Sequence, residues 1–188
     1  VITHAQVTKL LIEAGANSKR ATGIMLTTDK GQQQTIKADR EVILAAGAIG
    51  SPQLLQVSGI GPAELLQKTD VPCLHDLRGV GENLQDHLQI RTIYKVQNTV
   101  TLNQRYHSIL GKMSMGLEYL LFKTGPLTMP PSQLGAFGKS DPIQQSANIE
   151  WHVQPLSLDR FGEPLHRFNA ITPSVCNLRP TSRGHVRI

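Results

Sequence analysis

The sequence has few aromatic residues and no concentrated run of basic residues, and both shortages argue against a nucleic-acid-binding protein. Aromatic residues make up 4% of the 188 residues and charged residues 18%. Proteins that bind single-stranded nucleic acid combine a concentrated basic surface with aromatic side chains on which bases stack. Here the net charge is +5, but the basic residues are scattered along the chain. We therefore expect no nucleic-acid partner.

Cysteines and long hydrophobic runs are scarce as well. Cys73 and Cys176 lie far apart, and neither has a second cysteine or a histidine at the spacing of a metal site. They indicate reduced thiols, with no disulfide framework and no bound metal. No apolar run approaches the ~20 residues of a membrane span, and no signal peptide opens the sequence. We expect no transmembrane segment and a cytoplasmic protein, with peripheral attachment to a membrane as the alternative.

Two sequence motifs that mark phosphate-binding loops and catalytic serines are absent. Glycine pairs occur at 47/50, 59/61 and 79/81, but none completes Gly-x-Gly-x-x-Gly between a strand and a helix. No Gly-x-Ser-x-Gly sequence occurs either. The sequence therefore contains neither a dinucleotide-binding fingerprint nor the nucleophile turn of a hydrolase. Because both of its ends have the composition of a strand interior, we expect an internal piece of a longer protein.

The remaining sequence is organised around residues 41–61. Residues 42–45 are short, apolar and uninterrupted, which predicts a buried strand. Residues 46–48 are all small. Ser51-Pro52 predicts a helix start, because serine suits the N-cap and proline suits the first helical position; Gly59 ends the helix. A strand, a small-residue turn and a capped helix present bare backbone and a positive helix end to a ligand.

This stretch resembles the second signature of the glucose–methanol–choline (GMC) flavin oxidoreductases, in residues 47–61. Residues 77–87 are similar to the Gly-Val-Gly-x-Asn-Leu-Gln-Asp-His element of the same family. Three later segments match more loosely, at 113–125, 149–155 and 178–188. Together the matches span nearly the whole chain, in the order that the family has them.

The resemblance implies an α/β (α+β) fold in two parts. Residues 1–88 are expected to form part of an FAD-binding Rossmann-like domain with a β-meander. Residues 89–188 are expected to form part of a substrate-binding domain, a mostly antiparallel sheet with helical cover. The hydrophobic content of 39% is enough to bury a core in each.

Hydrophobic patterning predicts the elements within these two parts. The first part has four candidate strands separated by polar turns at 14–17 and 29–31. In the second part, Asn103 is expected to cap one long helix that runs to about Phe122. The candidate strands are 1–5, 9–13, 21–28 and 34–38 in the first part, and 89–96, 133–137, 148–153 and 168–177 in the second.

The resemblance also implies an FAD cofactor and its contact residues. These are Val7, whose backbone would lie against the adenine, and Ala46, Gly47 and Ala48 in the small-residue turn. For Val7 the alternative is an ordinary core residue of a strand. Without the dinucleotide fingerprint, residues 1–188 alone are not expected to retain FAD.

The activity implied is that of an FAD-dependent alcohol dehydrogenase or oxidase, in which hydride passes from the alcohol carbon to flavin N5. No catalytic residue is expected within this chain, because the base histidine of the family would lie beyond Ile188. The chain alone is therefore expected to be inactive. Asp86 and His87 fall in an element that braces the flavin site, and we favour that structural role over acid–base chemistry.

Two residues are expected to line the substrate cavity. His152 matches a cavity histidine of the family, although a structural histidine on a sheet is the alternative. Gln133 falls where choline-oxidising members carry a glutamate that holds the quaternary ammonium. A neutral amide supplies no such charge, so a small neutral alcohol is expected rather than choline. On a strand, Trp151 and His152 point to opposite faces.

Some alternatives stay open at the level of sequence. The electron acceptor is unknown, with oxygen, a quinone and a dye all compatible, and so is the oligomeric state. A hypothesis from another class is a non-catalytic binding or assembly module that uses the sheet of residues 89–188.

Overall fold

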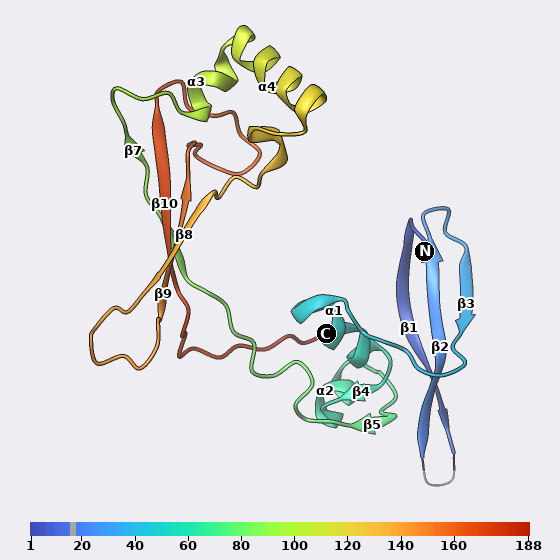
Figure 1. Cartoon of the computed structure of the whole chain (residues 1–188). Helices are drawn as coiled ribbons and strands as arrows, with labels where there is room; N and C mark the ends of the chain where they lie inside the picture. The colour runs from blue at the N-terminus through green and yellow to red at the C-terminus, as the bar shows by residue number, and fades with distance from the viewer. Residues whose placement is uncertain (16–17) are drawn as a thin grey trace. The chain divides into compact units, whose positions relative to one another are not determined.

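The structure, a computed structural model, describes residues 1–15 and 18–188 of the chain (Figure 1). These residues divide into two compact units. The first comprises Val1–Gln85 together with Ser182–Ile188, and the second comprises Asp86–Thr181. The predicted turn at 14–17 lies partly outside the described residues. The assignment of the two parts to an FAD-binding and a substrate-binding domain stays a prediction.

The first unit opens with an antiparallel β-meander in the order β1-β2-β3, as predicted. Its strands are β1 (Ala5–Ala14), β2 (Lys19–Thr28) and β3 (Gln33–Lys37). Residues 5–14 form one strand with two register shifts, not the two separate strands predicted. Residues 1–4 are not in a strand, and His4 has a φ of 55° that strand geometry excludes. The buried Leu10 also joins the meander to the next helix, because its N–H donates to Ser58 Oγ at 2.8 Å.

The signature helix α1 (Gly47–Val57) begins earlier than the predicted start at Pro52, which lies inside it. Gly47 has a φ of 78°, a conformation that a glycine adopts without the steric cost of a Cβ, and the helix starts there. Ser51 Oγ accepts a hydrogen bond from the N–H of Ala46 at 3.1 Å, so Ser51 supports the helix start from within the helix. The turn predicted at 46–48 is therefore the N-cap and first residues of α1.

The strand predicted at 42–45 is wrong for the described structure. These residues are in no strand, and Ile43 is 79% exposed. A strand exists only where a neighbouring strand accepts and donates its backbone hydrogen bonds, and no described residue pairs with 42–45. Hydrophobic composition alone could not show this.

The end of α1 follows the prediction. Gly59 has a φ of 86°, and its N–H donates to the carbonyl of Gln56 at 2.9 Å. A short parallel pair and a helix follow, namely β4 (Ile60–Gly61) with β5 (His75–Asp76), and α2 (Ala63–Lys68) between them. Pro62 is the N-cap of α2, and the fully buried Leu66 anchors it.

The second unit is built on an antiparallel sheet in the order β6-β10-β9-β8, with β7 also paired to β10. Its strands are β6 (Gln89–Arg91), β7 (Tyr94–Lys95), β8 (Leu134–Gly138), β9 (Ile149–Gln154) and β10 (Ala170–Asn177). The α/β (α+β) fold class with a mostly antiparallel second part is confirmed. The single strand predicted at 89–96 is split in two. Thr92 donates to the carbonyl of Pro173 at 3.1 Å, but Pro173 has no N–H to return a bond, so the ladder breaks there.

The long helix predicted from Asn103 is two helices, α3 (Leu102–His107) and α4 (Ile109–Phe122), followed by the 3₁₀ turn η1 (Pro126–Thr128). Ser108 interrupts the helix with an extended backbone, and its side chain accepts a hydrogen bond from the N–H of Gly111 as the cap of α4. Asn103 lies inside α3 and is fully buried, so it does not act as a cap. Within the described part of the chain, no helix has both the length and the apolarity to span a membrane.

Helix α4 contains two glycines with different surroundings, and these predict opposite effects of alanine. A Cβ at Gly116 would meet no atom within 4 Å, whereas a Cβ at Gly111 would collide with the carbonyl of Arg105. We expect Gly116→Ala to raise the free energy of unfolding by about 0.5–1 kcal/mol, because alanine loses less conformational freedom in a helix. Gly111→Ala should lower it. Urea unfolding of both variants checks this, and a loss of stability in Gly116→Ala would show that other atoms occupy the space beside α4.

Candidate functional site

The start of α1 leaves backbone groups uncovered. Ala46, Gly47 and Ala48 are exposed, and a Cβ at Gly47 would meet no atom within 4 Å. The first turn has no side-chain cap and no acidic residue. The N–H groups at this end therefore keep their partial positive charge for a ligand.

A hollow of about 200 Å³ lies beside this helix end. Its lining is Ala48, Pro52, Gly81, Glu82, Asn83, Leu84, Gln85 and Val186. The hollow thus brings together two segments that the sequence singled out separately, the signature at 47–61 and the element at 77–87. Gly81 has a φ of 82°, and a Cβ there would collide with the carbonyl of Val186, so this glycine permits the close approach that shapes the hollow.

The family resemblance also places Val7 and Asp86 near the flavin. Val7 is half-buried on β1 opposite Leu26, and it does not line the hollow beside Ala48. Asp86 Oδ1 accepts a hydrogen bond from the backbone N–H of His87 at 2.9 Å. The carboxylate thus fixes the main chain, which favours the bracing role over an Asp–His acid–base pair.

In the second unit, one face of the sheet carries His152. Residues directly opposite one another in an antiparallel sheet point to the same face. His152 of β9 lies opposite Gly135 of β8 and Ser174 of β10, and Ser174 lies opposite Arg91 of β6. Trp151 points to the other face, as predicted from the alternation. We call the face that carries His152, Ser174 and Arg91 the His152 face.

The imidazole of His152 is oriented by a neighbouring carboxylate on the same face. Its Nε2 lies 3.2 Å from Oε1 of Glu150, and about a third of the side chain is exposed, at 35%. The Nδ1 side of the ring is thereby turned away from the carboxylate. Burial raises the pKa of the Cys176 thiol opposite Glu150, and the Glu150 carboxylate raises that pKa further. Cys176 is therefore a neutral, unreactive thiol.

Gln133 lies just before β8, and its side chain is exposed. Its N–H donates to the carbonyl of Val153 at 3.1 Å, which holds it against the end of β9. Because Gln133 is two residues before Gly135, the alternation of strand residues places it on the His152 face. The two predicted cavity residues thus share one face of one sheet.

The His152 face also carries buried polar atoms that lack a hydrogen-bond partner among the described residues. These are Nε and Nη2 of Arg91 and Oε1 of Gln154. Gln154 is two residues after His152 on β9, and Arg91 lies two strands away. Sequence reasoning missed both residues. The alternation of 89–96 does separate Arg91 from Ile90, but no local pattern shows that a side chain will lack a partner.

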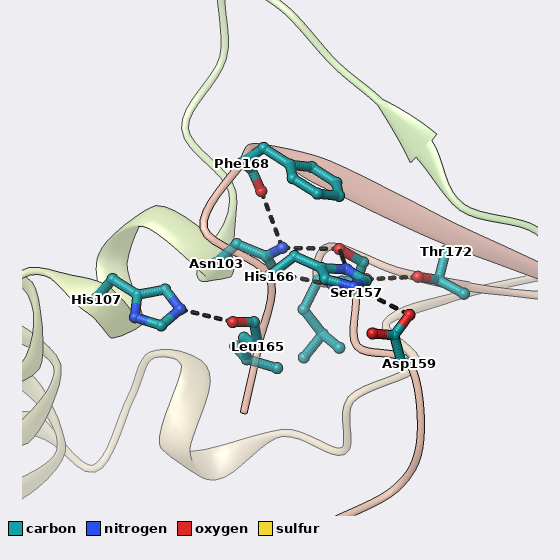
Figure 2. Close-up of polar contacts among 9 residues, drawn as sticks. Asn103, His107, Ser157, Asp159, Leu165, His166, Phe168 and Thr172 are labelled. Atoms are coloured by element: carbon teal, nitrogen blue, oxygen red, sulfur yellow. Dashed lines mark hydrogen bonds and ion pairs between the residues drawn. The ribbon is translucent and has the colours of Figure 1, made fainter. Parts of the chain in front are cut away.

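A polar network holds the loop of residues 155–169 (Figure 2). Asn103 Nδ2 donates to Ser157 Oγ at 2.8 Å and to the carbonyl of Phe168 at 2.9 Å, and its Oδ1 accepts from the N–H of Ser157 at 2.8 Å. His166 contacts Ser157 Oγ at 2.9 Å and Asp159 at 3.3 Å. Although these are the residue types of a hydrolase triad, Ser157 is 0% exposed and its Oγ is already engaged. The network therefore fixes the loop and performs no nucleophilic chemistry.

Comparisons with known proteins identify the family of the chain. The sequence profile of the family described as "GMC oxidoreductase" matches residues 1–89. The oxygen-dependent choline dehydrogenase of Yersinia pseudotuberculosis is 39% identical over 100% of this chain and 32% of its own length. The chain belongs to the GMC oxidoreductase family. It spans about a third of the length of the curated GMC relatives it matches.

Solved structures share the fold. A variant of the formate oxidase of Aspergillus oryzae, studied for its FAD modification, has a TM-score of 0.85 at 23% identity. The match covers 98% of this chain and 36% of that one. Pyridoxine 4-oxidase from Mesorbium loti has a TM-score of 0.68 at 26% identity, over 98% of this chain and 31% of that one. The resemblance to GMC proteins noted in the sequence is thus confirmed for family and fold.

The sequence predicts no bound metal. Within residues 1–15 and 18–188, no cluster of three or more His, Cys, Asp or Glu side chains is arranged to hold a metal ion.

Proposed function

We propose that this chain is the middle part of an FAD-dependent GMC enzyme that oxidises an alcohol. Residues 1–88 contribute to the FAD-binding domain and residues 89–188 to the substrate-binding domain. The observation that carries the proposal is the uncapped start of α1, open above Gly47 and next to the hollow lined by Ala48 and Asn83. Backbone N–H groups at a helix start bind anionic groups, and small residues let a flat ring approach the backbone.

The residues at this helix start fit the cofactor. Ala46, Gly47 and Ala48 would hold FAD through their backbone, and Val7 would contact its adenine from β1. FAD, when bound, accepts the hydride from the alcohol carbon at its N5 atom. The φ of 78° at Gly47 gives the helix start its open geometry, which a side chain would strain.

The substrate, in this proposal, binds on the His152 face of the second unit. Glu150 holds Nε2 of His152, so the imidazole keeps one orientation and can exchange a hydrogen bond with the alcohol oxygen. His152 orients the alcohol and is not the base. The base is a histidine expected beyond Ile188. Gln133 offers a neutral amide to the rest of the substrate.

Absorption spectroscopy of the full-length protein tests the proposal. A flavoenzyme shows the flavin bands, and these bleach when its alcohol is added without oxygen. A colourless protein that stays colourless after incubation with FAD would contradict the function. The same protein assayed with and without oxygen distinguishes an oxidase from a dehydrogenase.

Gln133 predicts the choice between choline and a neutral alcohol. A desolvated quaternary ammonium without a counter-charge costs several kcal/mol in real proteins, so choline should be the poorer substrate. Gln133→Glu should raise kcat/KM for choline, relative to a neutral primary alcohol of similar size, by roughly one to two decades. Steady-state kinetics on both substrates in both proteins measures the shift.

Gln145→Glu is the matched control, because it adds the same charge at an exposed position of the β8–β9 loop. It should leave the choline preference unchanged. Efficient choline oxidation by the unmodified protein would show that Gln133 does not set the choice, or that a carboxylate outside these residues supplies the charge.

A further inference from the structure

The buried polar atoms on the His152 face that have no partner define the chemistry of a complementary ligand. Buried donors and acceptors are nearly always hydrogen-bonded in native proteins, because an unpaired one loses its hydration without compensation. Among the described residues, the buried side-chain atoms without a partner are Nε and Nη2 of Arg91 and Oε1 of Gln154. All three lie on the face that carries His152. A ligand that satisfies them needs an acceptor at Arg91 and a donor at Gln154.

The two free atoms of Arg91 specify a carboxylate. Nε and Nη2 carry N–H groups on one edge of the planar guanidinium, and that edge makes two parallel hydrogen bonds to the two oxygens of a carboxylate. The face of the guanidinium is taken by Phe161, whose ring centroid lies 4.4 Å from Cζ. The face is thus packed, and the hydrogen-bonding capacity of the edge is unused although both of its atoms are buried.

No carboxylate of the described chain neutralises Arg91. Glu150 is on the same face, but its Oε1 lies 3.2 Å from Nε2 of His152. The ion pairs among the described residues do not include Arg91. The second cation at the edge of the sheet, Lys95, lies over the ring of Phe168 at 4.7 Å. Arg91 thus has no ion-pair partner among the described residues.

Gln154 specifies the other end of the ligand. Its Nε2 donates to Ser132 Oγ at 3.1 Å, which fixes the amide and leaves Oε1 as an unused acceptor. Gln154 is 7% exposed and lies on the same face of β9 as His152, two residues further along the strand. A hydroxyl placed there can donate to Oε1. Arg91 is two strand spacings from His152, roughly 10 Å between backbones, which a short molecule spans once both side chains reach inward.

We propose that the His152 face binds an alcohol that carries a carboxylate, that is, a short hydroxy acid. Arg91 holds the carboxylate side-on, and Gln154 and His152 hold the hydroxyl. This inference rests on the proposed function, since it names the class of alcohol that the enzyme oxidises. Because Nε and Nη2 of Arg91 are buried, side chains around them, the 74% exposed Phe161 among them, must move before a carboxylate can reach this edge.

The test compares two straight-chain primary alcohols of equal length, one ending in a carboxylate and one in a methyl group, in the full-length protein. The unmodified protein should prefer the carboxylate, measured as the ratio of the two kcat/KM values. Arg91→Met keeps an aliphatic side chain packed under Phe161 but removes the two N–H groups of the guanidinium edge. It should lower this ratio roughly ten- to hundredfold. Arg91→Lys keeps the positive charge but lacks the two parallel N–H groups, so its ratio should lie between those of the unmodified protein and Arg91→Met.

A matched control and a binding measurement separate this role from a structural one. Lys95→Met removes a cation that also packs on a phenylalanine of the loop, and it should leave the ratio unchanged. Calorimetry with the saturated carboxylate, which lacks the hydroxyl, should show binding to the unmodified protein and at least tenfold weaker binding to Arg91→Met. If Arg91→Met does not fold, the kcat/KM ratio and the carboxylate affinity of Arg91→Lys provide the test.

The outcomes distinguish this inference from the proposed function. If the methyl-ended alcohol is oxidised and neither Arg91 variant changes the ratio, the enzyme is an alcohol oxidoreductase and the hydroxy-acid inference is overturned. A lower unfolding temperature with an unchanged ratio also overturns it, and would mean that Arg91 pairs with a carboxylate of the protein. If the protein binds FAD but neither alcohol bleaches it, the hydroxy-acid inference is overturned, whereas a protein that binds no FAD overturns the proposed function itself.

Discussion

Replacing Asn103 by leucine should destabilise the full-length protein by about 2–5 kcal/mol. Asn103 is 0% exposed, and its amide satisfies the N–H of Ser157 and the carbonyl of Phe168. Leucine fills similar space but leaves the buried N–H of Ser157 and the half-buried carbonyl of Phe168 unpaired, at up to about 1–3 kcal/mol each. The unfolding free energy in urea measures the loss.

The same substitution should also alter the loop of residues 155–169, because Asn103 makes the buried bonds from α3 to Ser157 in this loop (Figure 2). Gln104→Leu is the matched control on the same helix. Gln104 is exposed, and its side chain makes one hydrogen bond, from Asn169 at 3.2 Å, so its loss should cost less than about 1 kcal/mol. Equal losses in the two variants would show that the Asn103 bonds contribute no more than a surface contact.

Elements whose cause is local were predicted well from the sequence. The meander follows from alternating residues and polar turns, and the strands at 133–137, 148–153 and 168–177 lie within two residues of those observed. Gly59 ends α1 because a residue with positive φ is needed at that point, and the sequence supplies glycine there. In each case the neighbouring residues determine the outcome.

Elements that depend on a distant partner were not predicted. Residues 42–45 have strand composition, but a strand needs a neighbour to bond with. The break between β6 and β7 arises because Pro173, about eighty residues later, lacks an N–H. The break at Ser108 is different, because a serine can cap a helix as readily as continue one, and tertiary packing decides.

Some residues of the candidate site were predicted from the sequence, and others became visible only in the fold. Gln133 and His152 were found through family resemblance, and their shared face became visible only with the register of β8 and β9. Arg91 and Gln154 were missed because lacking a partner is a property of the fold, which no residue type reveals. Gln56, inside the signature, gave no sign in the sequence that it is 0% exposed.

Gln56 joins the two ends of the first unit, and its position predicts the effect of removing it. Its Nε2 donates to the carbonyls of Val80 at 3.3 Å and Val186 at 2.9 Å, and its Oε1 accepts from the N–H of Ile188 at 3.1 Å. The residues after 181 are also joined to the rest of this unit by the paired bonds between Leu84 and Gly184, by the bond from Val186 to Gly81 and by the ion pair between Arg187 and Glu82. One amide on α1 thus fixes backbone from two remote segments.

Gln56→Leu should therefore destabilise the full-length protein by about 2 kcal/mol or more, since it leaves the buried carbonyl of Val80 and two half-buried backbone groups without this partner. It should also weaken FAD retention under the proposed function, because Val186 lines the hollow beside Ala48 and loses one of its two hydrogen bonds. The measurements are urea unfolding and the flavin-to-protein absorbance ratio after gel filtration. Gln53→Leu is the control, an exposed glutamine on the same helix, and it should change neither value.

If Gln56→Leu keeps full stability, the three bonds are replaced by water. If it loses stability but keeps its flavin, the hollow beside Ala48 is not part of the cofactor site.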